Sequence, residues 1–221
     1  MSSFPEAPQI VPGGHLHRPA APNGDSLVLT HGAGANSSAP LLIALANAFC
    51  DAGVTVLGYD LPFRQQRPHG PPPPGSATRD QEGIRAAVAS MRPHTSGRMF
   101  LGGHSYGGRQ SSMLCAAEPG LVDCLLLLSY PLHPPKRPAE LRTAHFPTLK
   151  TPALFVSGTR DGFGTADELA AALQLIPART ELLPIPSAGH ELMTTNNRNE
   201  LPKLVVEAFR SFAGKVQAIA R

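Results

Sequence analysis

The sequence predicts an α/β protein, a three-layer α/β/α sandwich built on a mostly parallel sheet of about six to seven strands. Two observations predict it. Short apolar segments alternate with helical segments along the chain, and several apolar segments are continuous runs, such as Cys124–Leu128. Continuous apolar runs are typical of strands that are covered on both faces. Regular alternation of strands and helices is typical of a parallel sheet with helices on each side.

The expected strands are short apolar segments bounded by turn residues or helices. In chain order they are Ser26–Thr30, Val54–Tyr59, Arg98–Gly102, Asp123–Ser129, Ala153–Ser157 and Glu181–Ile185. Residues 1–25 are rich in Pro and Gly and show little periodicity, so we expect an irregular N-terminal segment with at most a short strand at Gln9–Val11.

The expected helices lie between these strands. They are Ala39–Ala52, Asp80–Met91, Gly107–Ala117, Ala166–Ile176 and Glu200–Ala218. Gly53 fits a position just after a helix end. Thr165 and Glu168 have the spacing of a capping box, and the last helix carries one apolar stripe.

Two Pro-rich connections interrupt the pattern. His69–Gly75 contains four successive prolines and is expected to be a stiff surface loop. Pro131–Thr151 joins two expected strands and contains five prolines. It is too short and too rich in proline for a large lid domain.

Length and composition indicate one globular domain over residues 1–221. The chain is 42% hydrophobic and 16% charged, with a formal net charge of +3 and a pI of about 9.0. Its basic residues are scattered, which argues against a nucleic-acid or membrane-surface partner. No apolar run has the roughly 18 residues of a membrane span, and no signal peptide is evident, so a cytoplasmic location is expected. Nothing in the pattern indicates an oligomeric state.

Gly103-His104-Ser105-Tyr106-Gly107 matches the G-x-S-x-G pattern of a nucleophile elbow. In such an elbow the serine sits on a sharp, strained turn between a strand and a helix, and bulkier neighbours would clash there. An expected strand precedes this motif and an expected helix follows it. Ser105 is therefore the candidate nucleophile, against the alternative of an ordinary glycine-rich turn.

Asp161 and His190 are the candidate partners of Ser105. Each follows an expected strand, and the ends of parallel strands meet at one edge of the sheet. The chain order serine, aspartate, histidine is the order of the α/β-hydrolases. The alternatives are a turn aspartate at Asp161, a surface histidine at His190, and Asp167 as the acid, although Asp167 suits the first turn of a helix.

His31-Gly32-Ala33-Gly34 follows the first clear strand and is expected to form an oxyanion loop. The expected donors are the backbone N–H groups of Ala33, with Gly34 as an alternative, and of Tyr106. His31 is expected to brace the loop. An ordinary glycine-rich turn is the alternative.

Four arginines could contact a substrate carboxylate because they fall near expected strand ends: Arg64, Arg67, Arg109 and Arg160. Arg109 and Gly34 are the substrate-binding candidates, although solvated or structural arginines are the more common case. His15 and His17 lack a third metal ligand, so no metal site is expected. No cofactor is required. The cysteines are Cys50, Cys115 and Cys124 in apolar segments, and we expect them to be reduced core residues.

The three motifs His-Gly-Ala-Gly, Gly-His-Ser-Tyr-Gly-Gly-Arg and Gly-Thr-Arg-Asp-Gly-Phe-Gly resemble an α/β-hydrolase family related to testis-expressed and non-specific-lethal-complex proteins. That family is itself similar to dienelactone hydrolases. The likeness runs from about Leu27 to Phe212 and implies the α/β-hydrolase fold and the Ser-His-Asp triad. The elbow of these relatives often reads G-K-S-M-G-G-R, so Ser105 and Arg109 match while His104 and Tyr106 differ. Dienelactone hydrolases use a cysteine nucleophile, from which Ser105 departs.

Together the motifs predict a serine hydrolase that cleaves a small ester or thioester through a Ser-His-Asp triad. Its partner would be a small-molecule ester, and carboxylesterase activity is the first expectation. Amide or C–C bond cleavage on the same fold is an alternative. A second alternative is a non-catalytic scaffold or interaction protein with the same fold, since a fold alone does not establish activity.

Overall fold

A computed structural model describes residues 7–219 of the chain, and its centre is one eight-stranded sheet. The strand order is β1-β2-β4-β3-β5-β6-β7-β8. The strands are β1 (Gln9–Val11), β2 (Gly14–His17), β3 (Ser26–Thr30), β4 (Thr55–Tyr59), β5 (Met99–His104), β6 (Cys124–Leu128), β7 (Ala153–Gly158) and β8 (Thr180–Ile185). The six strands from β3 to β8 are parallel to one another, which confirms the predicted α/β class.

The N-terminal segment is not irregular as far as the structure describes it. β1 and β2 form an antiparallel hairpin, and β2 pairs antiparallel with β4. The turn contains Gly13 at φ 79°, a backbone angle that glycine tolerates well. The hairpin extends the sheet beyond the six to seven strands expected. β2 is only four residues long and has a single buried aliphatic side chain, Leu16, so its apolar signal is weak.

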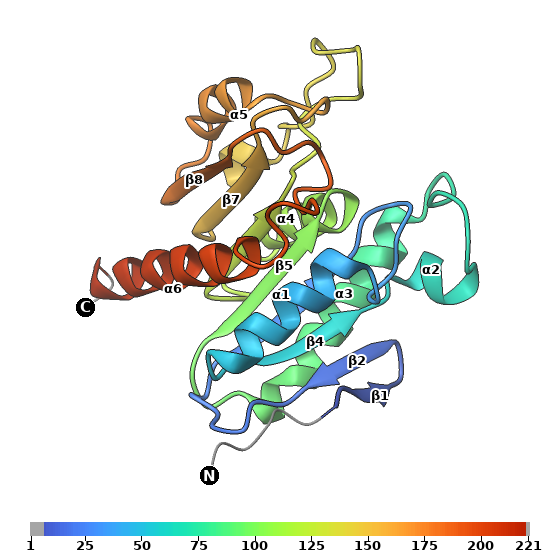
Figure 1. Cartoon of the computed structure of the whole chain (residues 1–221). Coiled ribbons are helices and arrows are strands. Elements are labelled where there is room, and N and C mark those ends of the chain that lie inside the picture. The colour runs from blue at the N-terminus through green and yellow to red at the C-terminus, as the bar shows by residue number, and fades with distance from the viewer. Residues whose placement is uncertain (1–6, 220–221) are drawn as a thin grey trace.

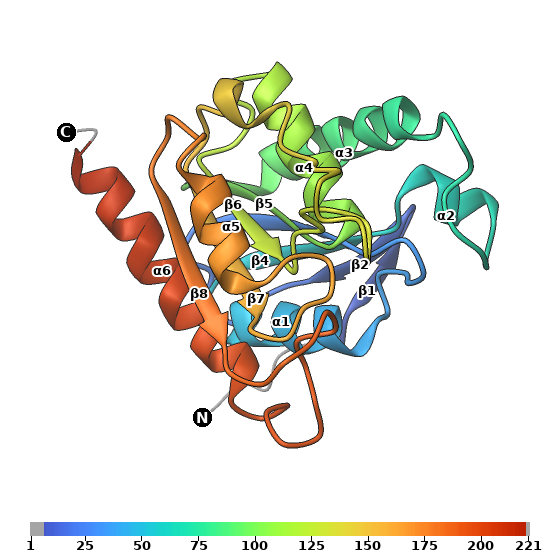
Figure 2. The ribbon, with the colours of Figure 1, turned by 90° about the horizontal axis from the view of Figure 1, so that it is seen from above.

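The helices cover both faces of the sheet (Figures 1 and 2). They are α1 (Pro40–Asp51), α2 (Pro62–Gln66), α3 (Ala77–Met91), α4 (Tyr106–Ala117), α5 (Ala166–Leu173) and α6 (Leu201–Ile219), with 3₁₀ turns η1 (Arg92–His94) and η2 (Phe146–Thr148). The helices α1 and α6 pack on one face, while α3, α4 and α5 pack on the other. The three-layer sandwich is therefore confirmed.

The helices differ from the expectation by more than one residue at three places. α2 was not expected, because five residues are too few to show helical periodicity. α3 begins at Ala77, three residues before the expected start, and so includes the buried Asp80. α5 ends at Leu173 rather than Ile176. Its start is as predicted, with Thr165 and Glu168 forming the capping box.

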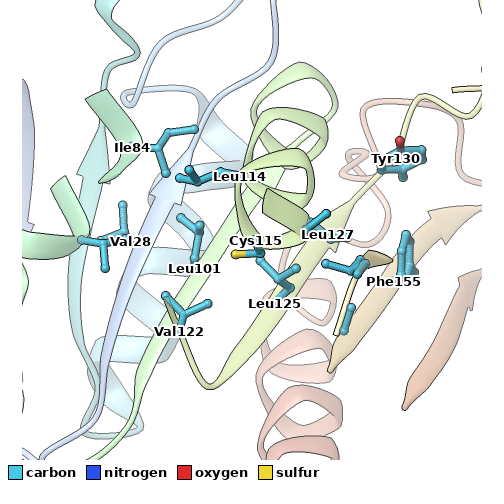
Figure 3. Close-up of a cluster of buried hydrophobic side chains, with 14 of the residues drawn as sticks. Val28, Ile84, Leu101, Leu114, Cys115, Val122, Leu125, Leu127, Tyr130 and Phe155 are labelled. Carbon is cyan, nitrogen blue, oxygen red and sulfur yellow. The ribbon is translucent and has the colours of Figure 1, made fainter. Parts of the chain in front are cut away.

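Two apolar cores fill the spaces between sheet and helices. One contains Val28, Leu101, Leu114 and Leu127 between the sheet and α3–α4, as Figure 3 shows. The other lies between the sheet and α1–α6, where the Phe209 ring contacts Phe100 edge-on. The three cysteines are buried and free. These cores fix the positions of the strand ends, and the polar side chains of the candidate site follow those strand ends.

Neither of the two Pro-rich connections forms a domain of its own. Residues 67–76, which include the four prolines, join α2 to α3 at the surface. Residues 129–152 join β6 to β7 and contain only η2, so no lid domain is inserted there. Within residues 7–219 no helix is both long enough and apolar enough to cross a membrane.

Candidate active site

Ser105 occupies a strained turn between β5 and α4. Its φ is 50° and its ψ is −114°, a conformation that a non-glycine residue adopts at a cost of roughly 1–3 kcal/mol. Backbone bonds hold it there, since its N–H donates to the Leu128 carbonyl at 2.8 Å. The flanking glycines are a steric requirement. A Cβ at Gly103 would lie 2.2 Å from Thr30 Oγ1, and one at Gly107 would lie 2.4 Å from the same atom.

The structure brings Ser105, His190 and Asp161 together in one hydrogen-bonded chain. Ser105 Oγ lies 2.8 Å from His190 Nε2. His190 Nδ1 lies 3.0 Å from Asp161 Oδ1 and 2.9 Å from Asp161 Oδ2. Asp161 is 2% exposed, whereas the His190 side chain is 18% exposed and so remains open to a ligand.

Asp161 fixes which nitrogen of His190 carries the proton. A carboxylate only accepts hydrogen bonds, so Nδ1 must be the donor to it. Nε2 then presents its lone pair to the Ser105 hydroxyl. Asp161 is itself fixed, because its Oδ1 accepts the Phe163 N–H at 2.8 Å. The Phe163 ring lies over the imidazole, with their centroids 4.2 Å apart.

Two backbone N–H groups next to Ser105 are available to a ligand. Tyr106 is the first residue of α4, so its N–H has no acceptor within the helix. Among residues 7–219, the N–H groups of Ala33 and Tyr106 have no protein acceptor, whereas the Gly107 N–H donates to the His31 carbonyl at 3.1 Å. Gly34 lines the same cleft, but a Cβ there would meet nothing within 4 Å. The glycine of this loop that has no room for a side chain is Gly32, where a Cβ would lie 2.9 Å from His104 Nδ1.

Two buried side chains brace the loop that carries Ala33. His31 Nδ1 donates to the Gly32 carbonyl at 2.8 Å, and its Nε2 accepts the Leu61 N–H at 3.0 Å. Burial lowers the pKa of His31, which keeps the ring neutral and suited to both bonds. Arg64 donates to the carbonyls of Ala33 and Ala35 at 2.8 and 2.7 Å.

Arg64 is therefore a structural residue, and the idea that it binds a substrate carboxylate is wrong. It is 5% exposed, and it also donates to the carbonyls of Arg67 and Gly70, at 3.0 and 2.9 Å. The side chains of Arg67 and Arg160 are exposed to solvent. Arg109 is half-buried, and its Nε atom is buried without a hydrogen-bond partner.

His104 is a site residue that the sequence reasoning missed, although it lies inside the elbow motif. Its Nε2 donates to the His190 carbonyl at 2.9 Å, and the two rings lie 5.2 Å apart. Burial lowers the pKa of His104. This contact ties the loop that carries His190 to the end of β5, immediately before Ser105.

Asp80 is a second residue that the sequence reasoning missed. It is fully buried, and its carboxylate accepts the Tyr106 hydroxyl at 2.7 Å and the Phe63 N–H at 3.1 Å. Burial is the main reason that the pKa of Tyr106 is raised. A lone aspartate inside an amphipathic helix gives no sequence signal of this role, because the partner lies 26 residues away.

A cleft of about 360 Å³ opens beside the Ser105 hydroxyl. It is lined by residues 32–35, His104, Ser105, Phe163, His190 and Glu191. A smaller hollow of about 160 Å³ shares Gly32, Ala35, His104 and Glu191 with it and continues to the apolar side chains of Leu41 and Met193. The combined space has an apolar branch next to a polar centre.

The other candidates lie apart from this cleft or in structural roles. Asp167 is exposed in the first turn of α5. His15 and His17 lie in β2, not in a flexible loop, where His15 Nδ1 contacts Ser37 Oγ and His17 Nδ1 contacts Asn47 Oδ1, both at 3.1 Å. Among the described residues, no group of three or more His, Cys, Asp or Glu side chains is arranged to hold a metal ion.

Residues 23–215 match a protein family described as an alpha/beta hydrolase domain. Solved structures show the same fold at low identity. A dienelactone hydrolase from Anabaena variabilis is 20% identical with a TM-score of 0.69, and the match covers 90% of this chain and 91% of that one. An alpha-beta serine hydrolase homologue from Coxiella burnetii is 18% identical, with a TM-score of 0.71 and coverage of 94% and 99%. Est1E from Butyrivibrio proteoclasticus, with ferulic acid bound, is 17% identical, with a TM-score of 0.73 and coverage of 91% and 95%.

Proposed function

Because the chain belongs to the alpha/beta hydrolase domain family, we propose that it is a serine hydrolase that cleaves small esters or thioesters. The observation that carries this proposal is the continuous hydrogen-bonded chain from Ser105 through His190 to Asp161. A strained, half-buried serine with an oriented base has no evident structural benefit. It is the arrangement that activates a hydroxyl for nucleophilic attack.

In the first half-reaction the Ser105 Oγ attacks the carbonyl carbon of the ester. His190 Nε2, 2.8 Å away, takes the hydroxyl proton as the new C–O bond forms. The imidazole becomes a cation, and the buried Asp161 carboxylate stabilises that cation through Nδ1. His190 then returns the proton to the leaving alcohol or thiol, and an acyl-enzyme on Ser105 remains.

The Ala33 and Tyr106 N–H groups would stabilise the negative oxygen of the tetrahedral intermediate. Donors of this kind are aligned before the reaction, so they cost no reorganisation as charge develops. The bonds from His31 and Arg64 hold the loop that carries Ala33, and α4 holds Tyr106. Loss of one such donor typically lowers kcat on the order of 10²–10³-fold.

In the second half-reaction a water molecule replaces the alcohol. His190 takes a proton from this water as it attacks the acyl carbon, and gives that proton to Ser105 Oγ as the acid leaves. The chemistry therefore returns the protein to its starting protonation state, and it needs only side chains and N–H groups of this chain.

The size of the cleft favours a small substrate. A volume of about 360 Å³ lies at the lower end of the roughly 300–1,000 Å³ found for ligand pockets. The hollow of about 160 Å³ lined by Leu41 and Met193 offers space for a short aliphatic group. A carboxylesterase acting on short acyl or alcohol groups is the specificity that this space suits best.

The test is hydrolysis of p-nitrophenyl acetate and p-nitrophenyl butyrate by the wild-type protein, Ser105→Ala and, as a matched control, Ser187→Ala. Ser187 is an exposed turn residue in the loop that carries His190. We expect the wild type and Ser187→Ala to turn over both esters and Ser105→Ala to lose activity. Equal activity in all three proteins, or none in the wild type, would favour the non-catalytic alternative.

A further inference from the structure

The ring of Phe163 lies against the imidazole of His190. Their centroids are 4.2 Å apart and their planes make an angle of 31°, which is close to a parallel stack. A second aromatic neighbour, His104, lies farther away, with its ring centroid at 5.2 Å and its plane inclined by 50°. Phe163 is half-buried and lines the cleft beside the Ser105 hydroxyl. Its ring face is therefore the closer of the two to the base that takes the proton from Ser105.

The backbone holds Phe163 in this position from both sides. Its N–H donates to Asp161 Oδ1 at 2.8 Å, and its carbonyl accepts the His133 N–H at 3.0 Å. The next residue, Gly164, has a φ of 144°, and a Cβ there would lie 2.7 Å from Leu132 Cβ. The turn after Asp161 therefore fits tightly against the connection between β6 and β7. Because the Phe163 ring is placed before a substrate binds, it needs no reordering during a reaction.

The loops that follow β7 and β8 pack directly on each other, which brings Phe163 onto His190 (Figure 2). The Arg160 N–H donates to the Ala188 carbonyl at 2.9 Å. A Cβ at Gly158, the last residue of β7, would lie 2.3 Å from the oxygen of the same carbonyl, so the approach of the two loops requires glycine there. Contacts between backbone groups therefore fix the position of the aromatic ring relative to the base.

The imidazole of His190 becomes a cation in the proposed reaction, when Nε2 takes the proton of the Ser105 hydroxyl. Asp161 stabilises that charge at the edge of the ring, through Nδ1. An aromatic face carries partial negative charge and attracts a cation that lies within about 6 Å of the ring centroid. The separation of 4.2 Å between Phe163 and His190 meets this condition. The half-buried position of Phe163 limits the screening of this attraction by water.

The other aromatic neighbour adds no competing charge. Burial is the main reason that the pKa of His104 is lowered, so its ring is neutral near pH 7. Its Nε2 donates to the His190 carbonyl at 2.9 Å and leaves the imidazole of His190 itself free to take up a proton. The contact with Phe163 is therefore not offset by a like charge on His104.

We propose that Phe163 stabilises the imidazolium of His190 through a cation–π contact and so accelerates proton transfer from Ser105. This inference rests on the proposed serine hydrolase function and assigns Phe163 a part in it. Phe163 acts through His190, so it is a positioning residue, and its effect falls on kcat because both half-reactions form the imidazolium. A residue that only forms a wall of the cleft would need the shape and apolarity of the ring. The cation–π contact needs the electrons of the ring face as well.

The experiment changes the electrons of the ring while keeping its shape. The residues 4-fluoro-, 3,5-difluoro- and 3,4,5-trifluorophenylalanine are placed site-specifically at position 163, beside the variants Phe163→Tyr and Phe163→Leu. Each fluorine withdraws negative charge from the ring face and leaves the ring apolar. The control is trifluorophenylalanine at Phe209, a buried ring in the core between the sheet and α1–α6. The quantities measured are kcat and KM for p-nitrophenyl butyrate, and thermal melting checks that each protein is folded.

We expect kcat to fall with each added fluorine while KM stays nearly unchanged. The loss should reach roughly 3- to 30-fold in the trifluoro protein and in Phe163→Leu, the range that follows from a cation–π contact. Phe163→Tyr keeps an aromatic face and should stay close to the wild type, as should the Phe209 control. A kcat that is flat or rises across the fluorinated series, or that falls equally in the control, would overturn the inference while the hydrolase function stands.

Covalent labelling of Ser105 tests the same contact without ester turnover. A fluorophosphonate that reacts with Ser105 also sends the hydroxyl proton to His190, so the fluorinated series is repeated on the rate of labelling. A rate that falls with fluorination supports the role of Phe163 even if no ester is hydrolysed. A rate independent of fluorination counts against that role. A wild type that neither hydrolyses esters nor is labelled would overturn this inference together with the proposed function.

Discussion

Replacing Asp161 with asparagine should nearly abolish turnover while changing the site by a single oxygen-to-nitrogen exchange. In the wild type, Asp161 Oδ1 accepts the Phe163 N–H at 2.8 Å and Oδ2 lies 2.9 Å from His190 Nδ1. An asparagine must keep its oxygen toward Phe163, since an NH₂ group there would face another donor. Its NH₂ group then faces His190 Nδ1.

This exchange reverses the tautomer of His190. Nδ1 becomes the acceptor of the asparagine NH₂ group, so the proton moves to Nε2 and points at Ser105 Oγ, 2.8 Å away. A protonated Nε2 cannot take the serine proton. We expect kcat to fall by about 10⁴-fold, the effect that a wrong histidine tautomer has in serine proteases.

The assay is p-nitrophenyl butyrate hydrolysis at slightly alkaline pH with Asp167→Asn as the matched control. Asp167 is exposed in the first turn of α5 and lies outside the hydrogen-bonded chain. Asp167→Asn should keep wild-type kcat. If Asp161→Asn retains kcat within about tenfold of wild type, or if both variants lose the same activity, Asp161 does not set the tautomer and the reasoning fails.

Three further predictions concern the surroundings of the site. Tyr106→Phe removes one hydrogen-bond donor from the buried Asp80 carboxylate, which should lower the free energy of unfolding by about 1.5–3 kcal/mol. At roughly 2–4 °C per kcal/mol for a chain of this size, Tm should fall by about 3–12 °C. An unchanged Tm would show that the hydroxyl contributes nothing to stability. Arg64→Gln should lower kcat by up to about 100-fold, because the loop that carries Ala33 loses its support. Substitution of the exposed Arg67 by glutamine should leave kcat unchanged. Equal kcat values in the two variants would contradict the bracing role of Arg64. The free energy of unfolding should decrease as the pH falls from about 6.5 toward 5. Burial lowers the pKa of His31 and of His104, so the unfolded chain takes up protons that the folded protein excludes. A Tm that is constant or rises as the pH falls over that range would refute this prediction.

The sequence predicted the layers of the fold because burial on both faces leaves a strong apolar signal. β6 is the clearest case, because its five buried residues are one cysteine followed by four leucines. β2 and α2 were missed because four or five residues show too little periodicity. Helix α5 was expected to extend three residues too far, since the apolar Leu175 and Ile176 continue its pattern after the regular helix has ended.

The triad residues were predictable because their order along the chain and their positions just after strands limit where they can lie. Ser105, Asp161 and His190 each follow a strand, so a parallel sheet places them at the same edge. The bracing roles of Arg64 and Asp80 were not predictable, because each depends on a partner in another element, 31 and 26 residues away along the chain. Burial distinguishes these two side chains from surface residues, and a single sequence does not show which charged side chains are buried.

The central claim is that Ser105 is an activated nucleophile, and covalent labelling tests it most directly. The intact protein would be incubated with a fluorophosphonate probe and the modified residue located by peptide mass spectrometry. We predict one adduct, on Ser105, that forms much more slowly in His190→Ala. A folded protein that acquires no adduct on Ser105, or one that is labelled equally fast without His190, would contradict the account.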